Sequence, residues 1–279
     1  MWSTVETKWK LIADNTICRV FSAGVNKGYS YPYRLVSSQS LRPSVRERSL
    51  ELIVDSGYHD PDVTNQDVIE RAGSYNVDYL IPRDTIGDGD ETVEMMKEFF
   101  DVFSAAPECH AKPFAVIQPP YEQTLANHGE FYSQFGHFAL GGLRNYGPVQ
   151  QVEEIVSFYE GLKSLSGVSA RSVSIHALGV GLSPEVVHVL RQNPFLLDSL
   201  DISTPELAIK NNRIPDSLWE QVGINLPRGT YRRDLQAQYA EATLYMMNYL
   251  LGTQVDEEDL YDRYISRRTA EVAAVGDDD

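Results

Sequence analysis

Three aspartates, Asp55, Asp84 and Asp201, each end or follow a short apolar run that is typical of a buried β-strand. Gln118 and His176 occupy the same kind of position in two further runs. A carboxylate can act as a nucleophile or as a general acid or base, and two carboxylates can divide these roles. The set therefore predicts acid–base and nucleophilic chemistry, provided that the strands carrying it end at one face.

The elements that position these residues alternate along the chain. The expected strands cover residues 17–21, 35–37, 52–54, 78–82, 114–117, 138–140, 173–177 and 197–202, and the expected helices cover 64–72, 90–103, 121–135, 149–165 and 184–191. About eight strand–helix units in this order predict an α/β fold, a single (β/α)₈ TIM barrel. An open doubly wound sheet is the alternative, but the glycine-rich phosphate fingerprint is missing after the first strand.

The C-terminal part of the chain is expected to extend the barrel. Residues 235–264 are predicted to form a long helix, so that residues 1–269 make one catalytic domain that includes it. Residues 270–279 are predicted to be a disordered acidic tail. In a parallel barrel the C-terminal ends of the strands converge on one face, and this topology predicts a shared site.

Each polar signal also has a structural alternative when it is taken singly. These alternatives are a turn at Asp55-Ser56-Gly57, an ion pair or helix cap at Arg83-Asp84, backbone hydrogen bonding at Gln118, close packing or a tight turn at Gly141-Gly142, a structural histidine at His176, and a helix cap at Asp198 or Asp201. Their joint occurrence at successive strand ends favours a functional site.

Composition limits the class of protein. No apolar run is long enough to span a membrane and the N-terminus has no signal-peptide layout, so a cytoplasmic protein is expected. The two cysteines, Cys18 and Cys109, fit neither a disulfide framework nor a zinc site. The net charge of −16 and the pI of about 4.8 suit either a protein from a high-salt habitat or an ordinary acidic enzyme. This acidity weakens a nucleic-acid interpretation without excluding it. At molar salt the Debye length falls to about 3 Å, so the net charge of the whole protein is screened and only local contacts count.

An ordered set of motifs resembles the guanine transglycosylases, which exchange guanine in a nucleic acid for a 7-deazaguanine base. The set is VDSGY (54–58), PRDTIGD (82–88), IQ (117–118), ALGGLR (139–144), HALGVG (176–181) and DSLDIS (198–203). The chain lacks the CxCxxC…H zinc site and the appended domain of the tRNA-modifying members. It is therefore more similar to the compact DNA-modifying branch of phages, archaeal viruses and genomic islands, and an acidic example would suit a halophilic virus or its host.

The resemblance implies a role for each matching residue. Asp201 corresponds to the nucleophile and Asp55 to the general acid/base, while Asp84 corresponds to the carboxylate that reads N1 and the exocyclic amine of the base. Gln118 and the backbone of Gly142 and Leu143 correspond to the groups that bind the oxygen side of the base. Tyr58 and Leu178 correspond to the side chains that sandwich the base, and Gly179 belongs to the same base-binding set. The family usually has two glycines after Asp-Ser, and this chain has only Gly57 there.

The implied chemistry is a double displacement that requires no cofactor and no metal. A carboxylate at Asp201 can stabilise positive charge at C1′ and then bond to that carbon. Asp55 can protonate the departing guanine and later take a proton from an incoming base of the preQ0 type. Contacts to the nucleic-acid backbone are expected from Arg144 and from Arg228, Arg232 and Arg233 in PRGTYRR (227–233), where Tyr231 could stack. A solvated positive loop is the alternative for that segment.

Three functions compete at this point. The first is a DNA guanine transglycosylase, with a tRNA-acting enzyme as its near neighbour. The second is a non-catalytic barrel that binds a base or nucleic acid and assists a partner. The third is an unrelated hydrolase that uses a carboxylate pair. A protein partner or a homodimer stays open in each case, and no membrane association is expected.

Overall fold

The computed structural model describes residues 18–24, 31–57, 62–165, 172–181 and 183–203, together with six residues between 240 and 251. Its strands are β1 (Arg19–Ala23), β2 (Tyr33–Ser37), β3 (Glu51–Asp55), β4 (Tyr79–Ile81), β5 (Lys112–Pro113), β6 (Ala115–Ile117), β7 (His137–Leu140), β8 (Ser174–Ala177) and β9 (Ser199–Ile202). Its helices are α2 (Pro43–Arg46), α3 (Asn65–Tyr75), α4 (Gly89–Ser104), α5 (Tyr121–Tyr132), α6 (Pro148–Ser164) and α7 (Pro184–Gln192), with short 3₁₀ helices η1 (Ser38–Ser40) and η2 (Leu143–Asn145).

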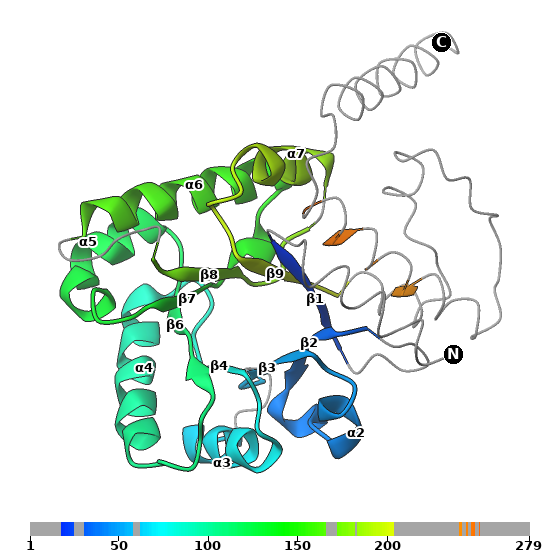
Figure 1. Ribbon diagram of the computed structural model, residues 1–279. Coiled ribbons are helices and arrows are strands. Elements are labelled where there is room, and N and C mark those ends of the chain that lie inside the picture. Colours follow the sequence, from blue (N-terminus) through cyan, green and yellow to red (C-terminus); the bar gives the residue numbers. More distant parts are fainter. Residues whose placement is uncertain are drawn as a thin grey trace, which may run out of the picture.

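The strands form one parallel sheet that curves almost into a closed barrel. Its order is β5-β4-β3-β2-β1-β9-β8-β7-β6, and every pairing between the described strands is parallel. The two ends of this order, β5 and β6, are consecutive in the chain and are separated only by Phe114. Figure 1 shows the strands as a ring with the labelled helices outside it. The expected α/β class and barrel-like sheet are therefore confirmed, and the near-closure disfavours an open doubly wound sheet.

Local sequence signals explain where the helices begin. Thr64 caps α3, because its hydroxyl accepts a hydrogen bond from Asp67 N at 3.1 Å while the Asp67 carboxylate accepts one from Thr64 N at 3.0 Å. This capping box satisfies two amide groups that the first turn leaves without partners. Ser183 caps α7 in front of Pro184, whose fixed φ suits the first helical position. The predicted starts at Thr64 and Pro184 are both confirmed.

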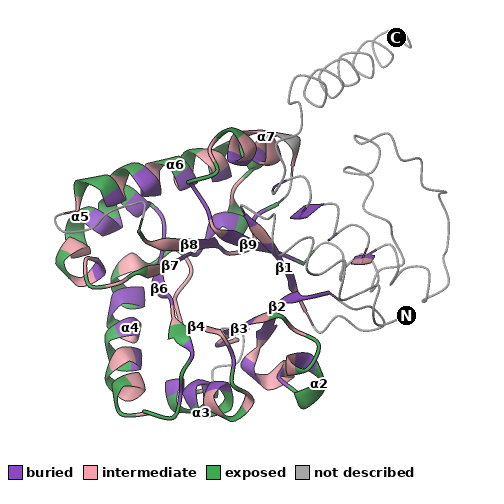
Figure 2. Ribbon diagram, viewed as in Figure 1, coloured by how far each residue is buried: buried purple, intermediate pink, exposed green. Residues whose placement is uncertain are grey.

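Alternation along β3 separates its outward-facing from its inward-facing residues. Leu52 and Val54 pack in a cluster with Val68 and Ile69 of α3, so they face the helical layer. Successive residues of a strand point to opposite sides. Asp55 therefore points to the inside of the barrel, together with Ile53, which belongs to the other apolar cluster. Figure 2 shows the strands largely buried and the outer faces of the helices exposed.

Aromatic rings fill much of the barrel interior. Neighbouring rings have centroids 5.3–6.1 Å apart, and they connect in the order Tyr33, Phe21, His176, Phe114, Tyr79 and His137. Offset and edge-on contacts at such distances are favourable beyond the area that they bury. We call these six residues the aromatic core. Because Tyr33, Tyr79 and His137 begin their strands, this core occupies the barrel on the N-terminal side of the strand ends.

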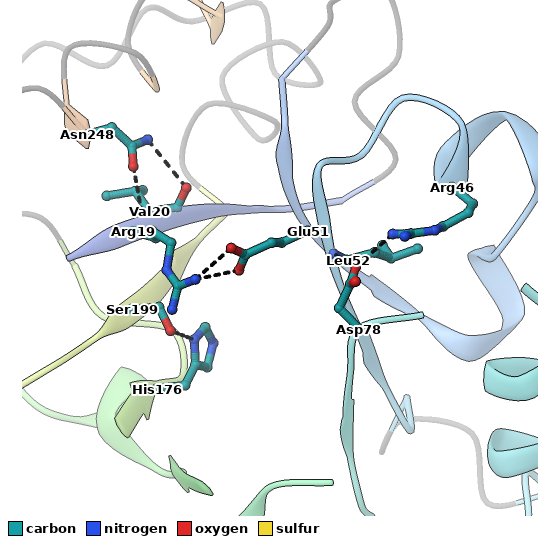
Figure 3. A network of polar contacts seen from close by, with 9 residues as sticks. All are labelled: Arg19, Val20, Arg46, Glu51, Leu52, Asp78, His176, Ser199 and Asn248. Atoms are coloured by element: carbon teal, nitrogen blue, oxygen red, sulfur yellow. Dashed lines mark hydrogen bonds and ion pairs between the residues drawn. The ribbon is translucent and has the colours of Figure 1, made fainter. Parts of the chain in front are cut away.

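Polar contacts at the N-terminal ends of the strands hold the barrel together (Figure 3). Arg19, which begins β1, donates from one nitrogen to both carboxylate oxygens of Glu51, which begins β3, at 2.6 and 2.7 Å. Arg46 forms an ion pair of 2.7 Å with Asp78, which also accepts a hydrogen bond from Leu52 N. In a parallel barrel this end serves stability, which leaves the opposite end for function.

Six residues of the expected C-terminal helix are described, and all six are helical: Ala240, Glu241, Leu244, Met247, Asn248 and Leu251. Asn248 is buried and its Oδ1 accepts a hydrogen bond from Val20 N at 2.9 Å, so this segment contacts β1. The remainder of the predicted helix 235–264 and the predicted tail 270–279 lie outside the described residues. None of the helices in the described part of the chain combines the length and the apolar composition needed to cross a bilayer.

Candidate active site

The polar residues singled out in the sequence lie at one end of the sheet. Asp55 is the last residue of β3, Gln118 directly follows β6, and Asp201 is the third of the four residues of β9. Asp84 lies three positions beyond β4, and Gly141 and Leu178 directly follow β7 and β8. All these strands are parallel, so their C-terminal ends share the face where barrel enzymes carry their catalytic groups.

A buried amide connects two of the strand ends. Gln118 is fully buried, and its Nε2 donates to Asp84 Oδ2 at 2.6 Å. Its Oε1 accepts a hydrogen bond from Gly87 N at 3.1 Å. Both ends of the amide are therefore held by the loop that follows β4. This arrangement orients the Asp84 carboxyl group and leaves one N–H of Gln118 for another acceptor.

Gly141 and Gly142 pack so closely on Gln118 and Pro119 that neither position has room for a side chain. A Cβ atom on Gly141 would lie 2.1 Å from Gln118 Nε2, and one on Gly142 would lie 2.8 Å from the Pro119 ring. Gly142 also has a φ of 75°, in the left-handed region that glycine adopts most readily. The tight turn and the close packing that the sequence suggested as alternatives are both present here.

The Asp55 and Asp84 carboxyl groups are close enough to influence one another. Burial and the nearby charge of Asp55 raise the pKa of Asp84 to about 7, against the opposing effect of the Gln118 hydrogen bond. Asp55 Oδ1 lies 3.3 Å from Ser56 Oγ and accepts a hydrogen bond from Gly57 N, also at 3.3 Å. Asp84 can therefore change its charge near neutral pH, which is unusual for an aspartate and common in active sites.

Asp201 is a buried carboxylate with a defined orientation. Its side chain is 9% exposed, and its Oδ1 accepts a hydrogen bond from Gly179 N at 2.8 Å. His176 Nε2 lies 3.6 Å from the same oxygen. Within the part of the chain that the structure describes, Gly179 N–H is the only hydrogen-bond donor to this carboxylate, so Oδ2 is left for another partner.

The structure also distinguishes between the two aspartates of DSLDIS. Asp198 Oδ2 accepts a hydrogen bond from Ile175 N at 2.7 Å, and this contact ties the segment before β9 to β8. Asp198 therefore has a structural contact, whereas Asp201 lies two residues into the strand, beyond Ser199. Neither residue caps a helix that the structure describes.

The other residues matched to the base-binding set lie around the same strand ends. Leu143 is fully buried, and its carbonyl accepts a hydrogen bond from Gln151 Nε2 at 2.9 Å. Leu178 packs against the apolar core and donates its N–H to Leu140 O. Arg144 is exposed, and its Cβ would be 3.3 Å from a Cβ placed on Gly179. Arg144 thus lies next to the loop that holds Asp201.

Tyr58, Arg228, Arg232 and Arg233 lie outside the described residues, as does Tyr231. Among the residues that are described, no group of three or more His, Cys, Asp and Glu side chains is arranged to hold a metal ion.

A groove of about 1260 Å³ lies on the outer surface between α5 and α6, lined by residues such as Leu125, Val152 and Val156. None of the polar residues at the strand ends lines this groove, so we do not assign the chemistry to it.

His176 is a structural histidine by its burial and hydrogen bonding, and it also lies beside Asp201. The sequence favours a hydrogen-bonded structural histidine over a catalyst at this position. Alternation along β9 puts Ser199 and Asp201 on the side that faces the barrel interior, and the register with β8 brings His176 to both.

Comparisons with known proteins add no assignment. Neither the scan against protein-family models nor the search of curated proteins found a match to this chain.

Proposed function

We propose that this protein is a guanine transglycosylase that exchanges guanine in DNA for a 7-deazaguanine base of the preQ0 type. Its scaffold would be a (β/α)₈ barrel in which β5 and β6 count as one strand interrupted at Phe114. The observation that carries the proposal is the arrangement at the strand ends. The negative charge of Asp55 raises the pKa of Asp84, and Asp84 is hydrogen-bonded to Gln118, which packs on Gly141 and Gly142. Asp201 lies on a different strand, β9, where Gly179 N–H orients it.

Asp84, together with the neighbouring Gln118 and Gly142, is suited to bind the hydrogen-bonding edge of a guanine. N1–H and the exocyclic amine are two adjacent donors, and a carboxylate can accept from both. O6 requires donors, which the remaining N–H of Gln118 and the backbone amides of Gly142 and Leu143 can supply. Gln118 already donates a hydrogen bond to Asp84 and accepts one from Gly87 N. Its main role would therefore be to orient the Asp84 carboxyl group, and its contact with the base would be secondary.

Asp201 and Asp55 suit the two roles in transfer. Oδ2 of Asp201 would attack C1′ while the bond from C1′ to the guanine nitrogen breaks, giving a covalent glycosyl ester. The guanine would leave with a proton from Asp55, and the incoming base would return a proton to Asp55 before displacing Asp201. Two inversions at C1′ give overall retention.

A base inside duplex DNA would have to leave the stack before it reaches this site, at a cost of a few kcal/mol. Arg144 is exposed beside the Gly179 loop and suits a phosphate near the site. Arg228, Arg232 and Arg233 remain expectations for further backbone contacts. Because the chain carries a net charge of −16, binding would depend on such local cations.

The direct test is incorporation of radiolabelled preQ0 into DNA and, separately, into tRNA by the full chain. The proposal predicts label in DNA that depends on both aspartates and is lost in Asp201→Ala and Asp55→Ala. Asp101→Asn is a matched control, because Asp101 is exposed on the outer helix α4 and should leave incorporation unchanged. Label in tRNA alone would reject DNA as substrate. Incorporation that survives both substitutions would reject the assigned roles.

Two outcomes would point to the competing functions. Binding of the base or of DNA without a covalent adduct in the wild type would indicate a non-catalytic barrel. Cleavage of simple glycosides without nucleic acid would indicate a hydrolase that uses the same carboxyl groups.

A further inference from the structure

His176 is a buried polar ring within the aromatic core. It lies on β8, is fully buried, and contacts Phe21 and Phe114 with ring centroids 5.6 Å away in each case. Its Nδ1 is 2.8 Å from Ser199 Oγ, a contact that Figure 3 shows. Its Nε2 has no hydrogen-bond partner among the described residues. One nitrogen of the ring is therefore satisfied and the other is not, although the whole side chain is buried.

Strand pairing explains which way the unpartnered nitrogen faces. His176 of β8 is in register with Ser199 of β9, and Asp201 is two residues further along the same strand. Residues two apart on a strand point to the same side. The imidazole therefore contacts Ser199 through Nδ1 and approaches Asp201 through Nε2, which lies 3.6 Å from Oδ1.

A purely structural role does not account for this arrangement. A buried nitrogen without a partner is unfavourable, and a phenylalanine or leucine would fill the same space without that cost. The distance of 3.6 Å is slightly longer than a hydrogen bond. Contacts of this kind are often long in a free enzyme and shorten once substrate is bound.

We propose that His176 is a positioning residue for Asp201, an inference that rests on the proposed function for its role in the reaction. The Ser199 hydroxyl donates to Nδ1, which leaves the imidazole proton on Nε2. Nε2–H and Gly179 N–H then both donate to Oδ1 of Asp201. With Oδ1 held in this way, Oδ2 faces C1′ as the nucleophilic oxygen.

The positioning contact persists through the covalent step. When Oδ2 bonds to C1′ and the guanine leaves with the proton of Asp55, Oδ1 becomes the carbonyl oxygen of the glycosyl ester. The same two donors remain on that oxygen, and no proton moves to or from His176. When the incoming base displaces the ester, negative charge returns to a carboxylate whose hydrogen-bond donors are already in place.

The first test reads the tautomer and requires no activity. In ¹⁵N-labelled full-length protein, long-range ¹H–¹⁵N spectra distinguish protonated from unprotonated imidazole nitrogens, and His176→Gln identifies the resonance. The expected result is a proton on Nε2 and none on Nδ1, with Ser199→Ala disturbing this preference. Asp201→Asn should shift the Nε2 resonance. A proton fixed on Nδ1, or an Nε2 resonance that ignores Asp201→Asn, overturns the proposal.

The second test separates positioning from packing through kinetics. Loss of one preorganised donor to a reacting group commonly costs about 10²–10³-fold in kcat. His176→Phe, which preserves an aromatic filling, is expected to lower kcat for base exchange by about that factor with less than about a threefold change in KM. His176→Gln retains a side-chain N–H and should recover part of the loss.

Phe114→Leu is the matched control, because Phe114 packs on the same ring but has no polar group to offer Asp201. It should lower the thermal unfolding temperature without a selective fall in kcat. Equal kinetic losses in His176→Phe and Phe114→Leu, or no loss in His176→Phe, overturn the positioning role. If wild-type protein exchanges no base, the proposed function fails, and the tautomer spectra still decide whether His176 donates to Asp201.

Discussion

The side-chain nitrogen of Gln118 lies 2.6 Å from Oδ2 of Asp84, and this hydrogen bond joins the end of β6 to the loop after β4. It opposes the burial and the Asp55 charge that together raise the pKa of Asp84 to about 7. A carboxyl group that titrates near neutrality beside a rigid amide is sensitive to small changes around it.

Gln118→Met should raise the pKa of Asp84 further, because it removes the donor that favours the charged carboxylate. A hydrogen bond to a charged group contributes about 1.5–3 kcal/mol, which corresponds to about one to two pH units. In the wild type, affinity for guanine or preQ0 should rise as the pH increases through about 7, where Asp84 becomes charged. The variant should show the same rise at higher pH in calorimetric titrations. A pH profile that coincides with that of the wild type would contradict the proposed contact.

Asp55→Asn should lower the pKa of Asp84, because the neighbouring negative charge disappears while the amide keeps a similar shape. Burial is the larger cause of the shift and remains, so the value should stay above 3.8. Carbon-13 NMR titration of the Asp84 carboxyl group in both proteins measures the difference. An unchanged midpoint would mean that the two carboxyl groups do not interact.

Asp84→Asn should stabilise the folded protein at pH 8 and have little effect below about pH 4. The pKa of Asp84 is higher in the folded state than its ordinary value of 3.8, so the folded wild type loses stability as pH rises from about 4 through 7. The asparagine has no charge to bury and avoids this loss, which we expect to be about 1–3 kcal/mol after solvent screening.

Urea unfolding of both proteins at several pH values checks this prediction. A variant that is equally destabilised at pH 4 and at pH 8 would show that the charge of Asp84 carries no folding penalty.

Gly141→Ala should displace Gln118 and thereby disrupt its hydrogen bond to Asp84. The added Cβ would lie 2.1 Å from Gln118 Nε2, and Gln118 is fully buried, so the side chain or the strand end has to move. We expect a loss of about 1–3 kcal/mol in the free energy of unfolding, together with weaker base binding.

Gly136→Ala provides the comparison for this change, since a Cβ there meets nothing within 4 Å. Chemical denaturation should show a clear deficit for Gly141→Ala and little change for Gly136→Ala. Equal behaviour of the two variants would contradict the close packing of Gly141 on Gln118.

The sequence by itself determined the features that depend on neighbouring residues. It predicted the helix starts at Thr64 and Pro184 and the strand-to-helix order, because these follow from local hydrogen bonds and apolar periodicity. It also predicted that Asp55, Asp84 and Gln118 would lie at the ends of different strands. The strand limits differ from the prediction at β2, which begins at Tyr33 and not at residue 35, because its pairing with β3 extends to Tyr33.

Only the tertiary structure decided which of these residues meet. Gln118 and Asp84 are 34 positions apart, and nothing in either segment specifies a hydrogen bond between them. The contact of Asp198 with Ile175 N and the approach of His176 to Asp201 likewise depend on how β8 and β9 align. Side-chain direction at a strand end is set by strand register and barrel curvature, and those follow from packing the whole sheet around its aromatic core.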